Sequence, residues 1–480
     1  MEPIIAQQSA SVRWALASLS LSVLLSSLGT SIANVALPNL ALAFDASFQA
    51  VQWIVLAYLL AITTLIVSVG RLGDLTGRRR LLLAGIGLFT AASVMCGVAP
   101  TLSVLIAARA LQGFGAAIMM ALTMAFVGET VSKERTGSAI GLLGTMSAIG
   151  TALGPSLGGV LIAGLGWQAI FLINVPLGVV ALFHAYRHLP LDKREEKTER
   201  TGFDYPGTVL LALTLGAYAL AMTMGRGHFG TLNAVLLVLA VCGVGLFVRI
   251  EANAASPLIR PAMFRNRVLS SSLTTSLLVS TVMMATLVVG PFYLGRSLGL
   301  GTALVGLVLS VGPLVAALTA TPAGRFADRF GAPRVTLIGL VGMVLGFATL
   351  ALLPTTPGVA GITSYLAPLV VITSSYALFQ TANNTAVMSD VNADQRGVIS
   401  GMLNLSRNLG LITGASVMGA VFAFALAASD VTHAQPGAVA VGMRVTYAVA
   451  AALIVIALIV AARAYRKTTG DRKLASQTSS

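Results

Sequence analysis

Long apolar runs alternate with short polar segments along the whole chain. Each run holds roughly 20 residues, which is the length that a helix needs to cross the ~30 Å hydrocarbon core of a bilayer. A β-barrel would instead show segments of about ten residues with alternating polarity. The chain is therefore predicted to be an all-α polytopic membrane protein. Its fourteen predicted spans cover residues 13–37, 48–69, 81–99, 102–129, 137–163, 168–187, 204–225, 231–250, 268–293, 302–323, 335–354, 362–388, 398–426 and 440–462.

The composition also indicates a protein that lies in lipid. Hydrophobic residues make up 56% of the 480 residues and charged residues only 10%, whereas an ordinary soluble domain carries roughly 25% charged residues. Cys96 and Cys242 lie inside apolar runs, so no disulfide framework is indicated. Residues 1–11 are polar and the apolar run after them is long enough to span, so we expect no cleavable signal peptide.

The net charge of +14 raises the question of nucleic acid binding. Most of the 30 lysines and arginines, however, fall in segments on one side of the membrane once the N-terminus is placed inside. Cytoplasmic loops of helical membrane proteins carry such an excess of cations. The charge is thus expected to set the topology, with both termini in the cytoplasm, and no nucleic acid partner is expected.

Two segments of the chain recur in the same order. Gly70–Arg80 returns in a less complete form as Gly324–Arg334, and Glu134–Gly141 resembles Asp394–Gly401. The glycines that follow the second pair of segments also match. A membrane chain built from two related halves is typical of a transporter.

The repeats divide the chain into two six-span halves and an inserted part. The expected boundaries are 1–190 for an N-terminal six-helix bundle, 191–267 for cytoplasmic linkers with an inserted helix pair at about 204–225 and 231–250, 268–466 for a C-terminal six-helix bundle, and 467–480 for a cytoplasmic tail.

The Gly70–Arg80 segment is a charged, glycine-rich turn between two apolar runs. Glycines let two helices turn tightly, and a carboxylate is favoured near a helix N-terminus. The alternative is a positively charged loop that sets the topology and has no gating role. The candidate gating residues are Gly70, Arg71, Asp74, Gly77 and Arg78, with Asp328 as a weaker counterpart in the second copy.

Arg109 lies inside the fourth predicted span, away from both of its ends. A cation in the membrane costs on the order of 3 kcal/mol on insertion scales, so it is a candidate functional residue. Gln112 lies one turn away on the same face. The alternative is an arginine whose long side chain reaches the lipid headgroups.

The fifth predicted span carries Gly150, Gly154 and Gly158 on one face, with Pro155 among them. Small residues four apart permit close approach of helices, and proline bends a helix. Taken alone, the pattern is common helix packing.

Together these motifs resemble those of the major facilitator superfamily, and in particular those of the 14-span drug:proton antiporter family. The resemblance runs from about Leu28 to the last span. It implies two six-helix bundles plus two extra central helices, and alternating access around a midplane site. It further implies that the Gly70–Arg80 segment latches the cytoplasmic side, that Arg109 takes part in proton coupling, and that the Gly-Pro pattern favours export.

The first predicted span departs from that family, whose members usually carry an aspartate there. The stretch Leu28–Pro38 keeps Asn34 but has Gly29 in place of the acid. None of the sixteen Asp and Glu residues is expected near mid-membrane. A cavity that holds Arg109 and Arg407 without a carboxylate should favour neutral or anionic compounds over lipophilic cations.

Proton coupling would then depend on Asp74, Glu129 or the substrate itself. The candidate coupling or cavity charges are Arg109, Glu129 and Arg407, and the candidate substrate contacts are Asn34, Gln112, Met120, Asn384 and Asn404. Interhelical hydrogen bonding explains such polar residues equally simply, and Met120 is either an adaptable cavity wall or a packing residue.

Catalytic and metal-binding motifs are missing. His184 and His188 have the spacing of a zinc helix, but Ala185 stands where that motif requires glutamate. No P-loop is present, so ATP is not the expected energy source. We expect neither an enzyme nor a bound metal or cofactor.

The sequence as a whole predicts a monomeric secondary-active exporter of small amphipathic neutral or anionic compounds. It is expected to be coupled to protons and to lie in a plasma membrane of the bacterial inner-membrane type. Two alternatives stay open: a dedicated exporter or facilitator of one metabolite, and a non-transporting receptor on the same scaffold.

Overall fold

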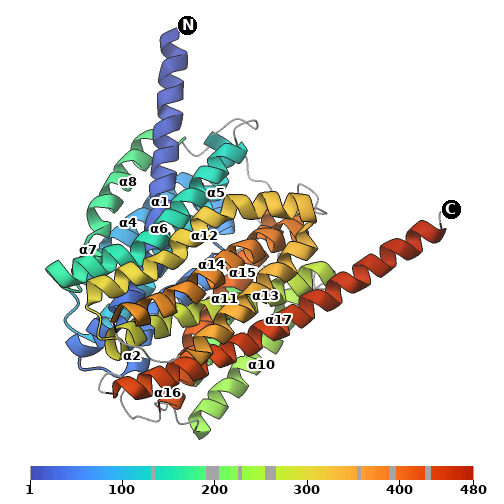
Figure 1. Cartoon of the computed structure of the whole chain (residues 1–480). Coiled ribbons are helices and arrows are strands. Elements are labelled where there is room, and N and C mark those ends of the chain that lie inside the picture. The colour runs from blue at the N-terminus through green and yellow to red at the C-terminus, as the bar shows by residue number, and fades with distance from the viewer. Residues whose placement is uncertain are drawn as a thin grey trace. The chain divides into compact units, whose positions relative to one another are not determined.

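The computed structural model of the chain is helical, with no strand among the residues that it describes (Figure 1). The prediction of an all-α protein is confirmed. The described residues are 2–66, 68–130, 136–190, 205–224, 230–253, 266–353, 358–388, 396–426 and 434–478.

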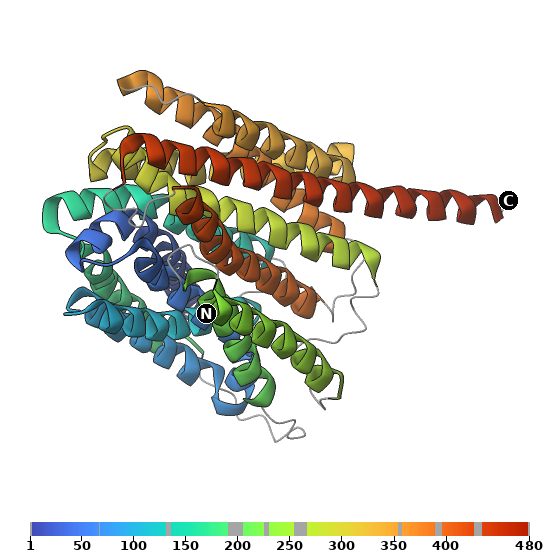
Figure 2. The same ribbon diagram turned by 90° about the horizontal axis from the view of Figure 1, so that it is seen from below.

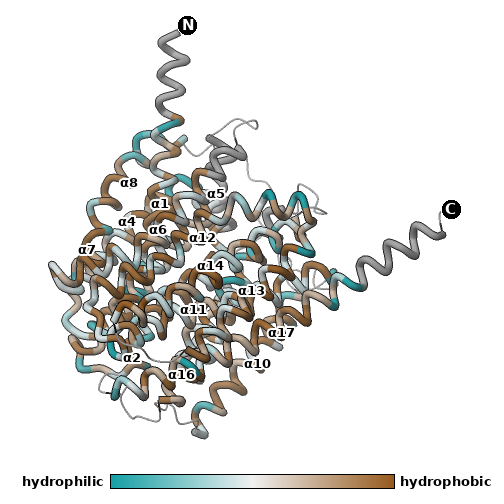
Figure 3. Tube along the Cα trace, in the orientation of Figure 1, coloured by the Kyte–Doolittle hydropathy of each residue, from teal (hydrophilic) through white to brown (hydrophobic). Residues whose placement is uncertain are grey.

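Fourteen stretches of the described residues are long and apolar enough to cross a membrane, as the sequence predicts. Figure 3 shows hydrophobic residues along the length of these helices. Most predicted ends agree with the structure within a few residues. The first and last helices run further: α1 (Glu2–Ala43) continues past Pro38, and α17 (Pro436–Thr478) takes in most of the expected tail.

The chain divides into two compact units. Unit 1 comprises Met1–Leu258 and Leu300–Ser310, and unit 2 comprises Ile259–Gly299 and Val311–Ser480. The inserted helix pair, α9 and α10, belongs to unit 1, and the predicted bundle boundaries stay predictions. Unit 1 contains α1, α2 (Phe48–Leu65), α3 (Val69–Thr76), α4 (Arg78–Gly97), α5 (Leu102–Thr130), α6 (Thr136–Leu165), α7 (Ala169–Leu172), α8 (Asn174–His188), α9 (Tyr205–Thr223), α10 (Thr231–Asn253) and the first turns of α12 (Thr302–Phe330).

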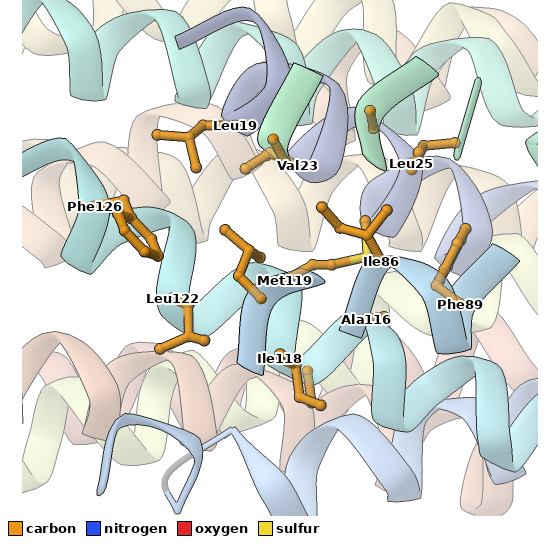
Figure 4. Close-up of a cluster of buried hydrophobic side chains, with 14 of the residues drawn as sticks. Leu19, Val23, Leu25, Ile86, Phe89, Ala116, Ile118, Met119, Leu122 and Phe126 are labelled. Carbon is orange, nitrogen blue, oxygen red and sulfur yellow. The ribbon is translucent and has the colours of Figure 1, made fainter. Parts of the chain in front are cut away.

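The core of unit 1 is built from the apolar faces of α1, α4, α5 and α8. Figure 4 shows Leu19, Ile86 and Met119 gathered in this cluster. Because lipid surrounds apolar side chains as well as a protein core does, helices in a membrane are held together by close packing and hydrogen bonds. Gly115 supplies such close packing, since a Cβ atom there would lie 2.6 Å from the backbone nitrogen of Phe89 on α4.

The matching glycines of the two halves make equivalent contacts. Gly150 and Gly154 of α6 lie against α1. Their counterparts Gly410 and Gly414 lie against α11, the first helix of unit 2. An added Cβ atom at any of the four would overlap an atom of the facing helix. The repeat in the sequence is therefore also a repeat in helix packing.

The charged segment Gly70–Arg80 is more helical than expected. Its first part belongs to α3, and the turn consists of the single residue Gly77, whose φ is 95°. Gly331 has the equivalent place in the second copy, with φ of 85°. Only glycine adopts this backbone without strain. The N–H groups of Gly77 and Gly331 each donate to the carbonyl four residues earlier, at 2.9 and 3.0 Å, and so close the preceding helix.

Unit 2 repeats the helical arrangement with two π-helical interruptions. Its last helix, α17, packs against α11 and α13, and its end runs beyond those neighbours (Figure 2). The elements of unit 2 are α11 (Arg267–Phe292), η3 (Tyr293–Ser297), the later turns of α12, α13 (Ala332–Leu352), α14 (Gly358–Met388), α15 (Arg396–Thr413), η4 (Gly414–Met418), α16 (Gly419–Ala425) and α17.

Candidate functional site

Arg109 is the largest fully buried side chain of the part of the chain that the structure describes, with no exposed surface. It lies on α5 and reaches two neighbouring helices. Its Nε donates to the Ile54 carbonyl of α2 at 3.0 Å, and one terminal nitrogen donates to the Gly29 carbonyl of α1, also at 3.0 Å. A single guanidinium thus ties three helices of unit 1 together.

The other terminal nitrogen of Arg109 starts a chain of side-chain hydrogen bonds. It donates to Gln112 Oε1 at 2.5 Å, and Gln112 Nε2 donates to Ser93 Oγ on α4 at 2.7 Å. Ser93 Oγ in turn donates to the carbonyl of Phe89 at 2.7 Å. The cation fixes the orientation of the Gln112 amide, because only its oxygen accepts. This chain adds α4 to the three helices that Arg109 joins.

Two aromatic rings cover the guanidinium of Arg109. Its Cζ atom lies 4.1 Å from the ring centroid of Tyr58 and 5.8 Å from that of Phe171 on α7. Tyr58 is itself held by a hydrogen bond from its hydroxyl to the Ser26 carbonyl at 2.8 Å. A desolvated cation over an aromatic face gains about 2 kcal/mol. The rings therefore help to replace the water that the buried cation has lost.

Arg109 forms no ion pair with any described residue. Its charge is balanced by two backbone carbonyls, one amide oxygen and two aromatic faces. Glu129 is on the same helix but 20 residues further on, which is roughly 30 Å along an α-helix. A buried cation without such partners would cost several kcal/mol. We call the set Gly29, Ile54, Tyr58, Ser93, Arg109 and Gln112 the arginine hub.

Gly29 is where this chain lacks the usual acid of the first span, and its surroundings explain the glycine. An added Cβ atom would lie 3.0 Å from the Tyr58 hydroxyl and 3.4 Å from the Cζ atom of the same ring. That is tighter than ordinary van der Waals contact. The backbone carbonyl of Gly29 accepts from Arg109 where a carboxylate would otherwise be expected. In this chain the first span supplies a dipole, and no formal charge, to the arginine.

The gating candidates occupy α3 and the turn after it. The backbones of Gly70, Arg71 and Asp74 lie in α3, but their side chains fall outside the described residues. Arg78 begins α4, and Asp328 is exposed on α12. The latch between Asp74 and the arginines therefore stays a prediction.

The glycines of the exporter pattern each have a packing contact. Gly158 faces Val35 of α1, where an added Cβ atom would lie 2.8 Å from a methyl carbon. The next residue, Gly159, faces the first turns of α12, where its Cβ atom would lie 2.8 Å from the Thr302 carbonyl. On that helix Gly306 in turn approaches the carbonyl of Pro155. The pattern thus brings α6 against two helices within unit 1.

Two of the candidate cavity residues, Asn34 and Met120, do not belong to the arginine hub. Asn34 is buried on α1, where its amide donates to the Thr30 carbonyl at 3.0 Å. Met120 packs against the hydrophobic cluster of unit 1. No hydrogen bond joins Asn34 or Met120 to Arg109, so the structure brings Arg109 together with Gln112 and leaves these two outside the hub.

Unit 2 holds three of the remaining candidates. Asn384 of α14 is half-buried, and Asn404 and Arg407 of α15 are exposed. The neighbouring Asn383 is the buried residue, and its amide donates to the Ser272 carbonyl of α11 at 3.3 Å. The Glu129 side chain lies outside the described residues.

The hub also contains residues that the sequence did not single out. Ser93 and Tyr58 lie in apolar spans where one hydroxyl is unremarkable, and Ile54 acts through its backbone alone. For Ser93 and Tyr58 the only available signal was a polar atom on the buried face of a helix.

His184 stacks on Trp14 with ring centroids 4.6 Å apart, and no group of three metal-ligating side chains occurs among the described residues.

Comparison with known proteins agrees with the fold. The family described as Major Facilitator Superfamily matches residues 19–415. A protein named riboflavin transporter RibZ, from Clostridioides difficile (strain 630), is 30% identical over 93% of this chain and 96% of its own length. The multidrug resistance protein Stp of Mycobacterium tuberculosis (strain ATCC 25618 / H37Rv) is 31% identical over 84% of this chain and 74% of its own.

A solved structure has the same fold. It is that of a bacterial homologue of the human lysosomal transporter Spinster, with a TM-score of 0.70 over 96% of this chain and 98% of that chain. The sequences are only 16% identical, so this likeness concerns the fold alone.

Proposed function

Because the chain belongs to the major facilitator superfamily and is a multi-pass membrane transporter, we propose that it is a secondary-active exporter that works by alternating access. We place it in a bacterial inner membrane, as a monomer, with both termini in the cytoplasm. The relative named for multidrug resistance supports export. The packed glycines around Pro155 on α6 support it as well, because they match the exporter pattern.

The observation that carries the choice of substrate is the arginine hub. Arg109 is a buried cation whose described partners carry no formal negative charge. A positive potential in a site of low dielectric disfavours cations and favours anions. The proposed substrates are therefore small amphipathic compounds that are neutral or anionic.

Protons are the proposed coupling ion. With Gly29 in the first span, the proton would be carried by Asp74, by Glu129 or by the substrate. Asp74 lies in α3 beside the turn at Gly77, where a change of protonation would act directly on a latch. In this proposal Gly70, Arg71, Gly77 and Arg78 complete the latch, with Asp328 as its weaker counterpart.

The two six-helix bundles, proposed at 1–190 and 268–466, move around the substrate. Arg407, Asn34, Asn384, Asn404 and Met120 are the proposed additional cavity residues. Asn34 supports its assignment best, since its amide oxygen is buried and accepts no hydrogen bond from a described residue. A substrate with an N–H or O–H group would satisfy that oxygen.

A second candidate function is a dedicated exporter or facilitator of one metabolite. It is favoured by the relative named as a riboflavin transporter, which matches nearly the whole chain. A facilitator would need no proton, in keeping with the missing acid at Gly29.

Reconstitution of the full chain in proteoliposomes tests both candidates. Three fluorescent probes differ in charge: riboflavin is neutral, carboxyfluorescein is anionic and ethidium is cationic. We expect an imposed pH gradient to drive riboflavin or carboxyfluorescein and not ethidium. Protein-free liposomes are the control for leakage. Asp74→Asn should abolish the response to the gradient, and Asp45→Asn, at an exposed carboxylate outside the proposed latch, is its control.

The outcomes separate the proposals. Movement of a probe by counterflow, but without response to a pH gradient, would remove proton coupling and favour the facilitator. Preference for ethidium would contradict the charge argument from Arg109. Movement of riboflavin alone would favour the dedicated transporter over an exporter of many compounds.

A further inference from the structure

The inserted helices α9 and α10 form a tightly closed hairpin. Asn233, at the start of α10, is buried, and its amide donates to the carbonyls of Ala221 and Met224 at the end of α9, both at 2.7 Å. Further along, Gly243 of α10 lies directly against the side chain of Thr214 of α9. The two helices are therefore expected to move as one body.

This hairpin is fastened at both ends of α9, to α2 at one end and to the joint between α2 and α3 at the other. At one end the indole N–H of Trp53 donates to Thr223 Oγ1 at 3.0 Å. At the other end Ser68 Oγ and Thr208 Oγ1 lie 2.8 Å apart in a hydrogen bond. Ser68, Thr208 and Thr223 are all at least nine-tenths buried. Water therefore does not compete for the Ser68–Thr208 bond.

Ser68 stands at the joint between α2 and α3. It is the N-cap residue of α3, a place where a serine side chain ordinarily bonds the backbone of the first turn. Here its side chain makes no capping bond and points to Thr208 on α9 instead. The hydroxyl that would have stabilised α3 alone is used to hold the joint to the inserted hairpin.

The second copy of the repeat lacks this joint. α12, which carries the copy of the charged segment, is continuous from Thr302 to Phe330. In unit 1 the same stretch is divided into α2 and α3, and the break lies where α9 is attached. The break and the attachment therefore occur together in the half that has the inserted pair.

We infer that the α9–α10 hairpin is a brace that fixes α3, and with it the turn at Gly77, relative to α2. The inference goes beyond the proposed function and rests on it in one respect, namely that α3 belongs to the gate. In this role the hairpin binds no substrate. It travels with α2, and the Ser68–Thr208 bond limits how freely α3 bends at the joint.

Loss of one buried hydroxyl pair should loosen the joint measurably. A net hydrogen bond contributes about 1 kcal/mol, and in lipid no water replaces the lost partner. This corresponds to roughly a fivefold change in the equilibrium between the closed and open joint. Backbone amides of α3 would then exchange with solvent correspondingly faster.

Hydrogen–deuterium exchange of the full chain in nanodiscs tests the brace without any substrate. We expect Ser68→Ala and Thr208→Val each to raise the exchange of peptides covering residues 68–77 by about fivefold. The double variant should add little to either single variant, because both remove the same bond. The matched control is Thr214→Val, a buried threonine on the same helix that faces α10 and has no hydrogen-bond partner for its hydroxyl among the described residues.

Exchange of residues 68–77 that is the same in Thr208→Val and Thr214→Val would overturn the inference. So would a uniform rise over all of unit 1, since that indicates general destabilisation. Counterflow of riboflavin by the same variants distinguishes the brace from the transport proposal. Faster exchange without transport of any probe would support the brace and contradict the proposed function. Transport with unchanged exchange would support the proposed function and contradict the brace.

Discussion

The α4–α5 pair of unit 1 and the α13–α14 pair of unit 2 pack alike but have different polar centres beside them. In each pair a glycine lets the backbones touch: a Cβ atom on Gly115 would lie 2.6 Å from the backbone nitrogen of Phe89, and one on Gly339 would lie 2.7 Å from that of Phe379. In unit 1 the polar centre is the cation of Arg109, which belongs to α5 itself. Unit 2 has a cluster of phenols there, and the charge of the half-buried Arg444 on α17 acts on one of them, Tyr293.

The phenols of unit 2 form a loose cluster. The hydroxyls of Tyr365 and Tyr447 lie 3.4 Å apart, and the ring centroids of Tyr293 and Tyr365 lie 5.8 Å apart. Removing one phenol hydroxyl strands at most one partner. Removing the Arg109 guanidinium removes three hydrogen bonds at once and leaves the Gln112 oxygen without its donor. The comparison teaches that the same helix packing tolerates either centre, but that in unit 1 three hydrogen bonds depend on a single side chain.

The largest effect is expected from Arg109→Met. The variant removes three hydrogen bonds of a charged donor, each of which contributes about 1.5–3 kcal/mol, and it leaves the oxygen of Gln112 without its donor. We expect unfolding to be easier by about 3 kcal/mol or more and transport to be lost. Thermal unfolding of the purified protein in detergent measures the first and the riboflavin assay the second.

Arg109→Lys is expected to have an intermediate effect. An ammonium keeps the charge but cannot reach three acceptors with the planar geometry of a guanidinium. We expect a loss of stability between that of Arg109→Met and wild type. A Met variant that melts like wild type and still transports would mean that the hub does not hold unit 1 together.

Glycine substitutions in the two halves should differ in a predictable direction. At Gly414 the atom that an added Cβ meets first is the backbone carbonyl of Thr281, whereas at Gly154 it is the side chain of Ser31. A side chain moves more easily than a backbone, so Gly414→Ala should destabilise more, within a range of about 1–3 kcal/mol. Thermal unfolding of both variants measures the difference.

Ser31→Ala serves as a rescue for the first half. Combined with Gly154→Ala it removes the atom that stands in the way, so part of the lost stability should return. No side-chain change is expected to rescue Gly414→Ala. Equal costs in the two halves, or no rescue, would show that the repeat packing is not limited by these contacts.

The sequence predicts the fold well because the bilayer limits the alternatives. A run of about 20 apolar residues has one stable solution in lipid, a helix, so all fourteen spans follow from length and polarity. Gly77 follows as well, because a glycine-rich turn between two spans needs a residue with positive φ. The helical form of α3 does not follow, since its eight residues are too short and too polar for either argument.

The candidate site is predictable only in part. Arg109 is conspicuous in an apolar run, and Gln112 follows from its spacing. The acceptors of Arg109 do not follow, because every residue carries a carbonyl and only the packing of α1 and α2 selects those of Gly29 and Ile54. The attachment of Ser68 to Thr208 is hidden for a similar reason, since hydroxyls in spans usually bond their own helix.

Gly29→Asp tests whether the missing acid sets the charge preference of unit 1. The new Cβ atom crowds the Tyr58 hydroxyl, so we expect a loss of about 1 kcal/mol in stability. The carboxylate would lie next to Arg109 and neutralise it, so the variant should gain movement of ethidium in the proteoliposome assay. Gly29→Ala is the matched control, because it adds the same Cβ atom without a charge.

If Gly29→Asp and Gly29→Ala have the same probe preferences, the charge of the hub does not determine which substrates are moved. A gain of ethidium movement in the Asp variant alone would tie the two together. It would also indicate that the glycine determines which compounds this chain moves.

The smallest effects are expected from the two tyrosines, and they sharpen the comparison between the units. Tyr58→Phe keeps the ring over Arg109 but removes the 2.8 Å hydrogen bond to the Ser26 carbonyl, which still accepts from the Thr30 hydroxyl at 3.0 Å, so it should cost about 1 kcal/mol. Tyr365→Phe removes a hydroxyl whose partner is 3.4 Å away, and bonds of that length are weak. It should cost about 0.5 kcal/mol or less. A double-mutant cycle of Tyr365→Phe with Tyr447→Phe measures the energy of that bond directly. A coupling energy larger than the cost of Tyr58→Phe would mean that the phenol cluster of unit 2 also depends on a specific hydrogen bond.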